Sequence, residues 1–166
     1  MRNNNKWNDL KTSLKTVLDK ISISSKKHLV SIINFSSEAL LEYINANPNQ
    51  INISSLNLMG KGTDFGKVLT ETLCLLQNDK SNLNVALIFM TDGEAKYPEN
   101  EIKALKTFIE NNFKTKTFKF YGLGFECKNE TLGKITQEFG GESQFANDGQ
   151  ELKNKYCEIF TKSLQK

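Results

Sequence analysis

The chain has 166 residues, of which 25% are charged and 38% are hydrophobic, and its formal net charge is +3. These values predict a single globular domain over residues 1–166, large enough to bury about 70% of the surface of its unfolded state. Because the positive charges are scattered along the sequence rather than clustered, they argue against a partner made of nucleic acid.

The N-terminal segment, the length of the apolar runs and the cysteines indicate where in the cell the protein is expected. The N-terminal segment MRNNNKWNDLK lacks the apolar core of a signal peptide, and no apolar run approaches the ~18 residues of a membrane span, so no membrane insertion is expected. Cys74, Cys127 and Cys157 are far apart, and the only histidine is His28, which argues against a zinc site. We expect reduced, buried thiols and favour an intracellular location.

The first half of the chain predicts a helix, two strands and a long loop. Residues 7–21 (WNDLKTSLKTVLDKI) carry apolar residues at three- and four-residue steps, the pattern of an amphipathic helix. Residues 28–35 (HLVSIINF) are apolar on both faces, as in a strand that is covered on both sides. Residues 37–44 (SEALLEYI) predict an edge strand, and residues 45–62 predict a loop rich in asparagine and glycine.

The second half alternates helices and strands, which predicts the α/β class with a mostly parallel sheet between two helical layers. The expected elements are a helix capped by Thr63 or Asp64, a strand at 84–90, a helix from about Pro98, a strand at 116–125, a short helix at 130–140, a strand at 143–146 and a closing helix from about Gln150.

Two motifs point to the carboxyl edge of this sheet, where ligands bind in folds of this class. Asp92 directly follows the apolar strand, and Gly93 lets the backbone turn away. Gly60 and Gly62 deliver Thr63 to the start of a helix at the same edge. A hydroxyl and a carboxylate facing each other suit Mg²⁺ or another hard cation. Taken alone, Asp92 and Gly93 would rather indicate a simple turn whose carboxylate caps the next helix.

The pair GKGTDFGKVL and LIFMTDGEA resembles the second and third metal-site motifs of von Willebrand factor A-type domains. HLVSIINFSSEALLEYI is similar to the second strand and the antiparallel third strand of that family, and FKFYGLGFE to its fifth strand. The resemblance implies a three-layer, doubly wound, Rossmann-like fold with one antiparallel edge strand. It also implies that Thr63 and Asp92 are metal-site residues, with Asp64, Gly93 and Glu94 on the partner-binding rim.

One part of the family pattern has no counterpart here. The family begins with a central strand ending in Asp-x-Ser-x-Ser, which supplies most of the metal's protein ligands, whereas this sequence starts at Met1, followed by a short polar segment and then KWNDLK. Our hypothesis is that Met1 closes such a motif in a longer chain. Without that strand, its two neighbours must pair directly or leave backbone groups unsatisfied, so the chain is expected to be marginally stable and to bind metal weakly or not at all.

The resemblance implies a protein-binding module, not an enzyme, whose rim-bound cation accepts an acidic residue of a partner protein. An α/β enzyme or nucleotide-binding domain using the same rim is the alternative, together with a non-functional fragment. The glycine spacing in GKGTDFGK is wrong for a phosphate loop, and in GLGFEC the residue Cys127 stands where a dinucleotide site needs glycine. Glu94 and Asp64 suit an acid/base pair or, equally, solvated charges at a loop and a helix start.

Overall fold

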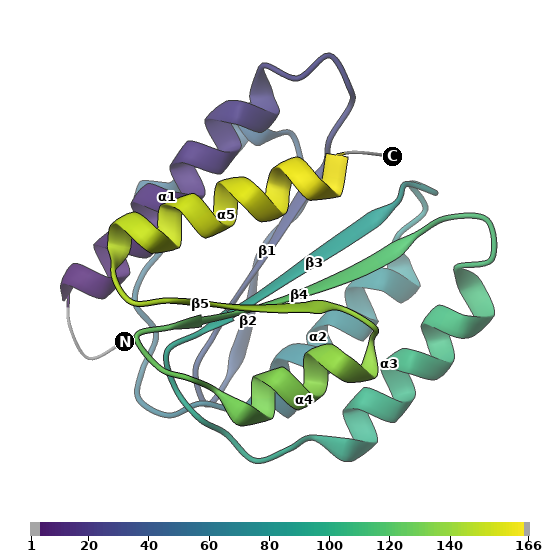
Figure 1. Ribbon diagram of the computed structural model, residues 1–166. Coiled ribbons are helices and arrows are strands. Elements are labelled where there is room, and N and C mark those ends of the chain that lie inside the picture. Colours follow the sequence, from purple (N-terminus) through teal and green to yellow (C-terminus); the bar gives the residue numbers. More distant parts are fainter. Residues whose placement is uncertain (1–3, 165–166) are drawn as a thin grey trace.

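The computed structural model describes residues 4–164, in which a layer of strands lies between two layers of helices (Figure 1). The strands are β1 (Val30–Phe35), β2 (Ala39–Ala46), β3 (Val85–Thr91), β4 (Phe118–Phe125) and β5 (Glu142–Ala146). The helices are α1 (Asn4–Ser22), α2 (Phe65–Asn78), α3 (Glu99–Asn112), α4 (Glu130–Glu138) and α5 (Gly149–Leu164), and two short 3₁₀ turns, Pro48–Gln50 and Ile53–Ser55, follow β2.

The predicted order of elements is confirmed, with shifts at their ends. The first strand begins at Val30 rather than at His28, and the predicted loop between β2 and α2 contains the two 3₁₀ turns. Asp64 is the residue that caps α2, because its carboxylate accepts a hydrogen bond from the Lys67 N–H at 3.1 Å. Pro98 precedes α3, as its restricted backbone favours.

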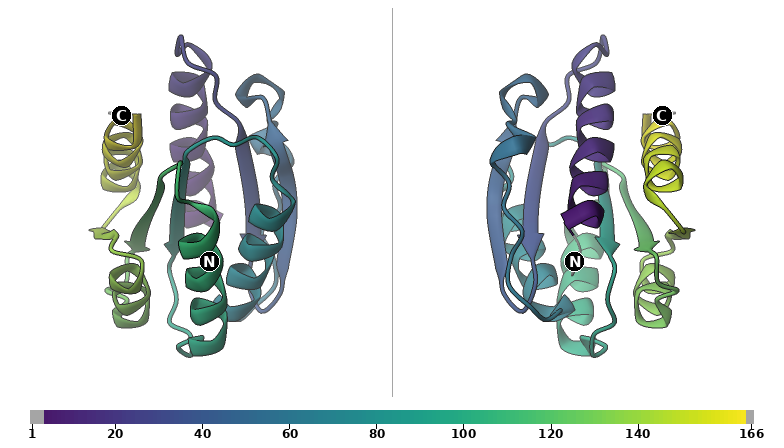
Figure 2. Two further views of the ribbon diagram at one scale, coloured as in Figure 1. Left: turned by 90° about the vertical axis from the view of Figure 1, so that its right-hand side faces the viewer. Right: turned by 90° about the vertical axis from the view of Figure 1, so that its left-hand side faces the viewer.

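The strands form two separate sheets. β3, β4 and β5 make a parallel sheet, and β1 and β2 make an antiparallel pair. The parallel sheet and the antiparallel edge strand were both predicted and are confirmed. β1 and β3 do not pair with each other, and almost nowhere along their length do their Cα atoms come within 8 Å. The side views show the two sheets as distinct parts of the strand layer (Figure 2).

Helices cover both faces of the strand layer. α1 and α5 pack on one face, and α2, α3 and α4 on the other (Figure 1). On the first face the core contains Leu123 and Phe125 of β4 with Leu152 and Ile159 of α5. Four apolar residues of α5 are buried: Leu152, Tyr156, Ile159 and Phe160.

Side chains connect the two sheets where their backbones do not. On the α2 face, the Phe35 and Phe89 ring centroids lie 5.3 Å apart, and Phe65 of α2 lies 5.3 Å from Phe89. On the opposite face, Trp7 and Leu14 of α1 pack against hydrophobic residues of both sheets. Packing of helices and aromatic rings therefore holds β1 beside β3.

The expectation that the cysteines are buried is wrong. Cys74 is exposed on α2, and Cys127 and Cys157 are half-buried. All three are free thiols. Cys74 and Cys157 lie on amphipathic helices whose inward stripes are filled by larger apolar residues, so the thiols fall beside those stripes.

Two glycines offer a matched test of the packing between β4 and α4. A Cβ at Gly122 would overlap the Thr136 hydroxyl and lie 3.2 Å from Leu132 Cγ, whereas a Cβ at Gly133 would meet nothing within 4 Å. Gly122→Ala should lower the free energy of unfolding by about 1–3 kcal/mol through overpacking. Gly133→Ala should raise it by roughly 0.5–1 kcal/mol, because alanine favours the helix. Urea denaturation followed by circular dichroism measures both, and equal changes in the two variants would contradict this packing.

Candidate functional site

The five predicted site residues all lie at the carboxyl edge of the strand layer. We call this edge the rim and define it by Thr63, Asp64, Asp92, Gly93 and Glu94. Thr63 and Asp64 stand at the start of α2, and the other three follow the end of β3. The rim therefore joins a loop from the β1 side of the layer to a loop from the β3 side.

Thr63 meets the β3 loop at Gly93. A Cβ placed on Gly93 would lie 2.9 Å from Thr63 Oγ1, so only glycine leaves the threonine hydroxyl this close to the turn. Gly62, with φ +101°, packs against Ser37. The Asp64 N–H donates a 2.8 Å hydrogen bond to the Ser36 carbonyl at the end of β1. These contacts fix Thr63 at the rim.

Asp92 is held by a tight turn. The buried Thr91 hydroxyl donates to the Gly93 carbonyl at 3.1 Å and accepts from the Gly93 N–H at 3.2 Å. Asp92 is half-buried between these two residues and lines the same cavity end as Thr63. The structure thus places Thr63 against the turn that follows Asp92, and both residues line one cavity.

Asp64 and Glu94 have structural partners at helix starts. Asp64 caps α2 as described, and Glu94 Oε1 accepts a 3.1 Å hydrogen bond from the Glu130 N–H at the start of α4. Both carboxylates are therefore placed where a helix dipole favours negative charge. Their role in partner binding stays a prediction.

Three residues outside the sequence motifs contribute to the rim. Asn129 Nδ2 donates to the Gly93 carbonyl at 2.6 Å, while Asn129 Oδ1 caps α4 by accepting from the Leu132 N–H at 2.7 Å. Glu126 turns the chain after β4 with φ +54° and forms a 2.8 Å ion pair with Lys6. The position of Asn129 just before ETLGKITQE is a helix-capping signal that could have located it.

The pKa of the Cys127 thiol depends on burial and on the charges of the rim. Burial raises the pKa of its thiol, and the Glu94 and Asp92 carboxylates raise that pKa further because they disfavour a nearby thiolate, while Lys6 lowers it. Burial is the main cause of this rise, and the two rim carboxylates add to it. A thiol of raised pKa is a poor nucleophile at neutral pH.

The residues present fit part of a cation site. Thr63 and Asp92 offer one neutral and one charged oxygen, a donor set that suits Mg²⁺, which prefers near-octahedral oxygen coordination and keeps several waters. Within residues 4–164, no group of three or more His, Cys, Asp or Glu side chains could hold a metal ion. Two protein oxygens alone do not compete strongly with water for such a cation.

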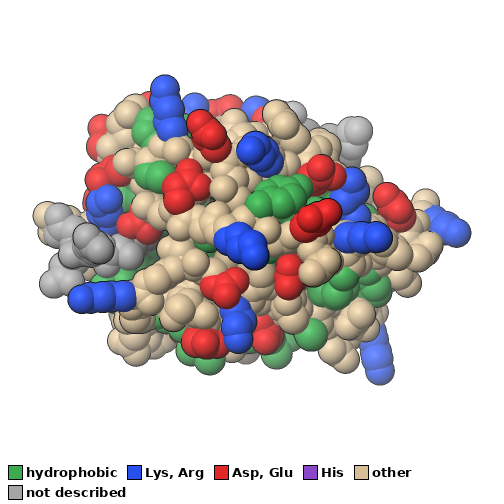
Figure 3. Space-filling view, turned by 90° about the horizontal axis from the view of Figure 1, so that it is seen from below, with side chains coloured by type: hydrophobic (Ala, Val, Ile, Leu, Met, Phe, Trp, Pro, Cys, Tyr) green, Lys and Arg blue, Asp and Glu red, His purple; other side chains and the backbone are tan. Residues whose placement is uncertain are grey.

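Charge on the face covered by α3 and α4 is mixed in sign. The space-filling view from this side shows lysine and acidic side chains interspersed (Figure 3). One such pair, Lys106 and Glu138, is 2.8 Å apart across α3 and α4. Interspersed charges are typical of a solvated surface rather than of a phosphate-binding patch. No helix in the described part of the chain combines the length and apolar character that a membrane span requires.

Comparison with known families agrees with this geometry. The sequence model of the von Willebrand factor type A (vWA) domain family matches residues 2–155. The chain belongs to this family. No curated protein sequence matches the chain.

Solved structures of the vWA family share the fold. A von Willebrand factor type A protein from Catenulispora acidiphila superposes with a TM-score of 0.75 at 17% identity, covering 97% of this chain and 39% of that one. Proximal thread matrix protein 1 from the mussel byssus, with a zinc-occupied MIDAS motif, superposes with a TM-score of 0.69 at 15% identity, covering 95% of this chain and 43% of that one. The pilus adhesin SpaC from Lactobacillus rhamnosus GG superposes with a TM-score of 0.65 at 15% identity, covering 95% of this chain and 28% of that one. The chain thus spans less than half the length of each of these proteins.

The thiol of Cys127 provides a test of how close the rim carboxylates lie to it. Glu94→Gln and Asp92→Asn each remove a negative charge that disfavours the thiolate, so each should lower the pKa of Cys127 and speed its alkylation at about pH 8. Iodoacetamide labelling followed by peptide mass spectrometry measures the rate at each cysteine. The exposed Cys74 on α2 is the internal control and should react at an unchanged rate. An unchanged rate at Cys127 in both variants would contradict the proximity of these groups.

Proposed function

We propose that this vWA domain is a protein-binding module and that its rim is the surface that contacts the partner. The observation that carries the proposal is the contact of Thr63 with the Asp92–Gly93 turn. One loop, before α2, supplies Thr63, and another, after β3, supplies the turn. Such junctions at the carboxyl edge of an α/β sheet are where ligands of this fold class bind. Two similar proteins, a pilus adhesin and a byssal matrix protein, support an interaction role.

A divalent cation, Mg²⁺ or a similar ion, would be held by Thr63 and Asp92. When bound, it would supply a positive charge with open coordination positions for a carboxylate of the partner. The relative with a zinc-occupied MIDAS motif supports a cation in the family. In this chain Asp92 would provide charge and Thr63 a neutral oxygen, and Gly93 would keep the two close. With only these two protein ligands, cation binding would be weak without the partner.

The partner would be a protein that presents an acidic side chain, and the module would not be an enzyme. Asp64 and Glu94 are engaged at helix starts, so neither is poised as a general acid or base. Their carboxylates and the adjacent exposed loop would instead form the polar border of the interface. The three free thiols support the expectation of a reducing, intracellular compartment.

Substitutions at the rim test the proposal directly. Asp92→Ala removes the charged oxygen and Thr63→Ala the neutral one, so both should abolish the weak heat of Mn²⁺ binding in calorimetry. Crosslinking and mass spectrometry measure how much of a partner each protein recovers. Each variant should recover at least about tenfold less of any partner than the wild-type domain does. Asp19→Ala, which removes an exposed carboxylate paired with Lys15 on α1, is the matched control and should behave as wild type.

Two outcomes would count against the rim. Partners recovered equally by wild-type protein and by both rim variants would place the interaction on another surface. Binding of a nucleotide to the purified protein, unaffected by Asp92→Ala, would instead favour the enzyme or nucleotide-binding alternative. Circular dichroism melts of all three variants separate a lost contact from a lost fold.

A further inference from the structure

Asn129 ties the turn after β3 to the start of α4. Its side chain ends in one donor and one acceptor, and each is used on a different segment of the chain. Nδ2 donates to the Gly93 carbonyl at 2.6 Å, and Oδ1 accepts from the Leu132 N–H at 2.7 Å. The first bond reaches the rim across 36 residues of sequence, and the second caps α4. Asn129 therefore links two loops.

The Gly93 carbonyl is held from two directions. The Thr91 hydroxyl donates to it at 3.1 Å and also accepts from the Gly93 N–H at 3.2 Å. Those two bonds close the turn on itself, whereas the bond from Asn129 fixes the turn relative to another part of the fold. The two donors together occupy both lone pairs of the carbonyl oxygen. The start of α4 thus helps to set the orientation of the peptide group that follows Gly93.

A second hydrogen bond joins the same two segments in the opposite sense. Glu94 Oε1 accepts from the Glu130 N–H at 3.1 Å, so the turn also supplies an acceptor to α4. Glu94 is exposed, and water competes for its carboxylate, whereas Asn129 is half-buried. Because a hydrogen bond shielded from water is the stronger restraint, the bond from Asn129 is the main tie between the turn and α4.

The other end of this tie is firmly anchored. Leu132 and Ile135 of α4 are buried against the sheet. A Cβ at Gly122 of β4 would overlap the Thr136 hydroxyl of α4, so helix and strand are in close contact. The bond from Asn129, at the start of this helix, therefore holds the turn against the parallel sheet.

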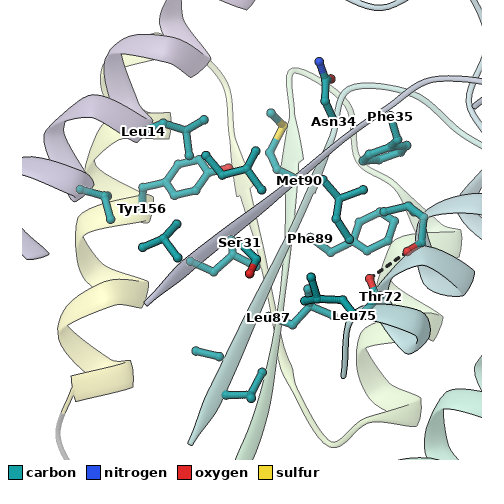
Figure 4. Close-up of a pocket in the computed structure, with 18 of the residues that line it drawn as sticks. Leu14, Ser31, Asn34, Phe35, Thr72, Leu75, Leu87, Phe89, Met90 and Tyr156 are labelled. Carbon is teal, nitrogen blue, oxygen red and sulfur yellow. Dashed lines mark hydrogen bonds between the residues drawn. The ribbon is translucent and has the colours of Figure 1, made fainter. Parts of the chain in front are cut away.

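The tie lies apart from the cavity of about 590 Å³ between β1 and β3. The walls of that cavity include Phe35, Leu87 and Phe89 (Figure 4), but neither Gly93 nor Asn129. The two hydrogen bonds of Asn129 are thus outside the space between β1 and β3.

The position of the turn sets where Asp92 lies relative to Thr63. Gly93 follows Asp92 directly, and a Cβ on Gly93 would lie 2.9 Å from Thr63 Oγ1. A rotation of the turn would move Gly93 away from the threonine hydroxyl and would redirect the carboxylate that precedes it. Holding the Gly93 carbonyl therefore holds the spacing of the two side chains to which a cation is assigned above.

We propose that Asn129 is a positioning residue of the rim, which acts by holding the turn rather than by contacting a cation or a partner. The part that concerns binding rests on the function proposed above, whereas the restraint on the turn is measurable without any ligand. The role requires an amide. Serine or aspartate at this position would still cap α4, but the serine hydroxyl is too close to the backbone to reach Gly93 as well, and an ionised carboxylate cannot donate.

Hydrogen exchange at single amides tests the restraint. In Asn129→Ser and Asn129→Asp, the Gly93 N–H should exchange about tenfold faster than in the wild-type protein, the change that corresponds to the loss of one hydrogen bond. The Leu132 N–H should keep its protection, because both substitutions retain the cap of α4. Nuclear magnetic resonance of the nitrogen-15-labelled protein follows both amides in one sample.

Asp148→Ser is the matched control. Both hydrogen bonds of Asp148 go to α5, to the N–H groups of Glu151 and Leu152, so this substitution exchanges a helix cap without touching the turn. Circular dichroism melts establish that each variant is folded. Unchanged exchange at Gly93 in both Asn129 variants, equal acceleration at Gly93 and Leu132, or an equal effect of Asp148→Ser would each overturn the proposal.

Calorimetry with Mn²⁺ separates this inference from the function on which it rests. Asn129→Ser should weaken Mn²⁺ binding by about tenfold, as expected for a residue that holds a metal ligand in place, whereas Asp92→Ala should abolish it. Asn129→Asp is unsuitable here because it adds a carboxylate beside the rim. If the wild-type protein takes up no Mn²⁺, the cation site fails, and exchange at Gly93 still decides whether Asn129 holds the turn. Binding lost in Asp92→Ala but unchanged in Asn129→Ser would overturn the positioning role.

Discussion

The arrangement of this domain depends on packing across a gap that no backbone hydrogen bond bridges. β1 and β3 are neighbours without being paired, and the contacts that hold them side by side come from Phe35, Phe65 and Phe89 on one face and from α1 on the other. Aromatic contacts of this kind are worth about 0.5–1.5 kcal/mol each beyond their buried area. A paired strand would add directional hydrogen bonds, so the two sheets are joined by the less specific of the two available interactions.

The candidate site inherits this constraint, because the rim spans the gap. Thr63 is tied to the β1 side through the hydrogen bond from Asp64 to Ser36 and through the packing of Gly62 on Ser37. Asp92 belongs to β3, and the contact of Gly93 with the Thr63 hydroxyl is where the two sides meet. Any change in the separation of β1 and β3 therefore changes the separation of the hydroxyl from the carboxylate.

Local pattern was sufficient to predict the elements and the positions of the candidate residues. The apolar run that ends at Asp92 and the glycines before Thr63 are signals within a few residues of sequence, and the structure places both residues at the carboxyl edge that these signals predicted. What the pattern could not supply was pairing between distant segments. Nothing in residues 28–35 or 84–90 distinguishes two strands that pair from two strands that leave a place between them. The prediction that Cys74 is buried failed for a related reason, since a thiol beside an apolar stripe resembles one within it.

The chemistry of the rim follows from how its carboxylates are already engaged. Asp64 and Glu94 each accept a hydrogen bond from the first turn of a helix, which stabilises that helix and commits one carboxylate oxygen. The charge of Glu94 still acts beyond its hydrogen bond, because together with Asp92 and after burial it raises the pKa of the Cys127 thiol. We propose Asp92 as the carboxylate that ligates the cation, because it directly follows β3 and lines the same cavity as Thr63. A surface that attracts cations but offers few ligands needs further oxygens from elsewhere, and an acidic partner supplies the kind of oxygen that such a cation prefers.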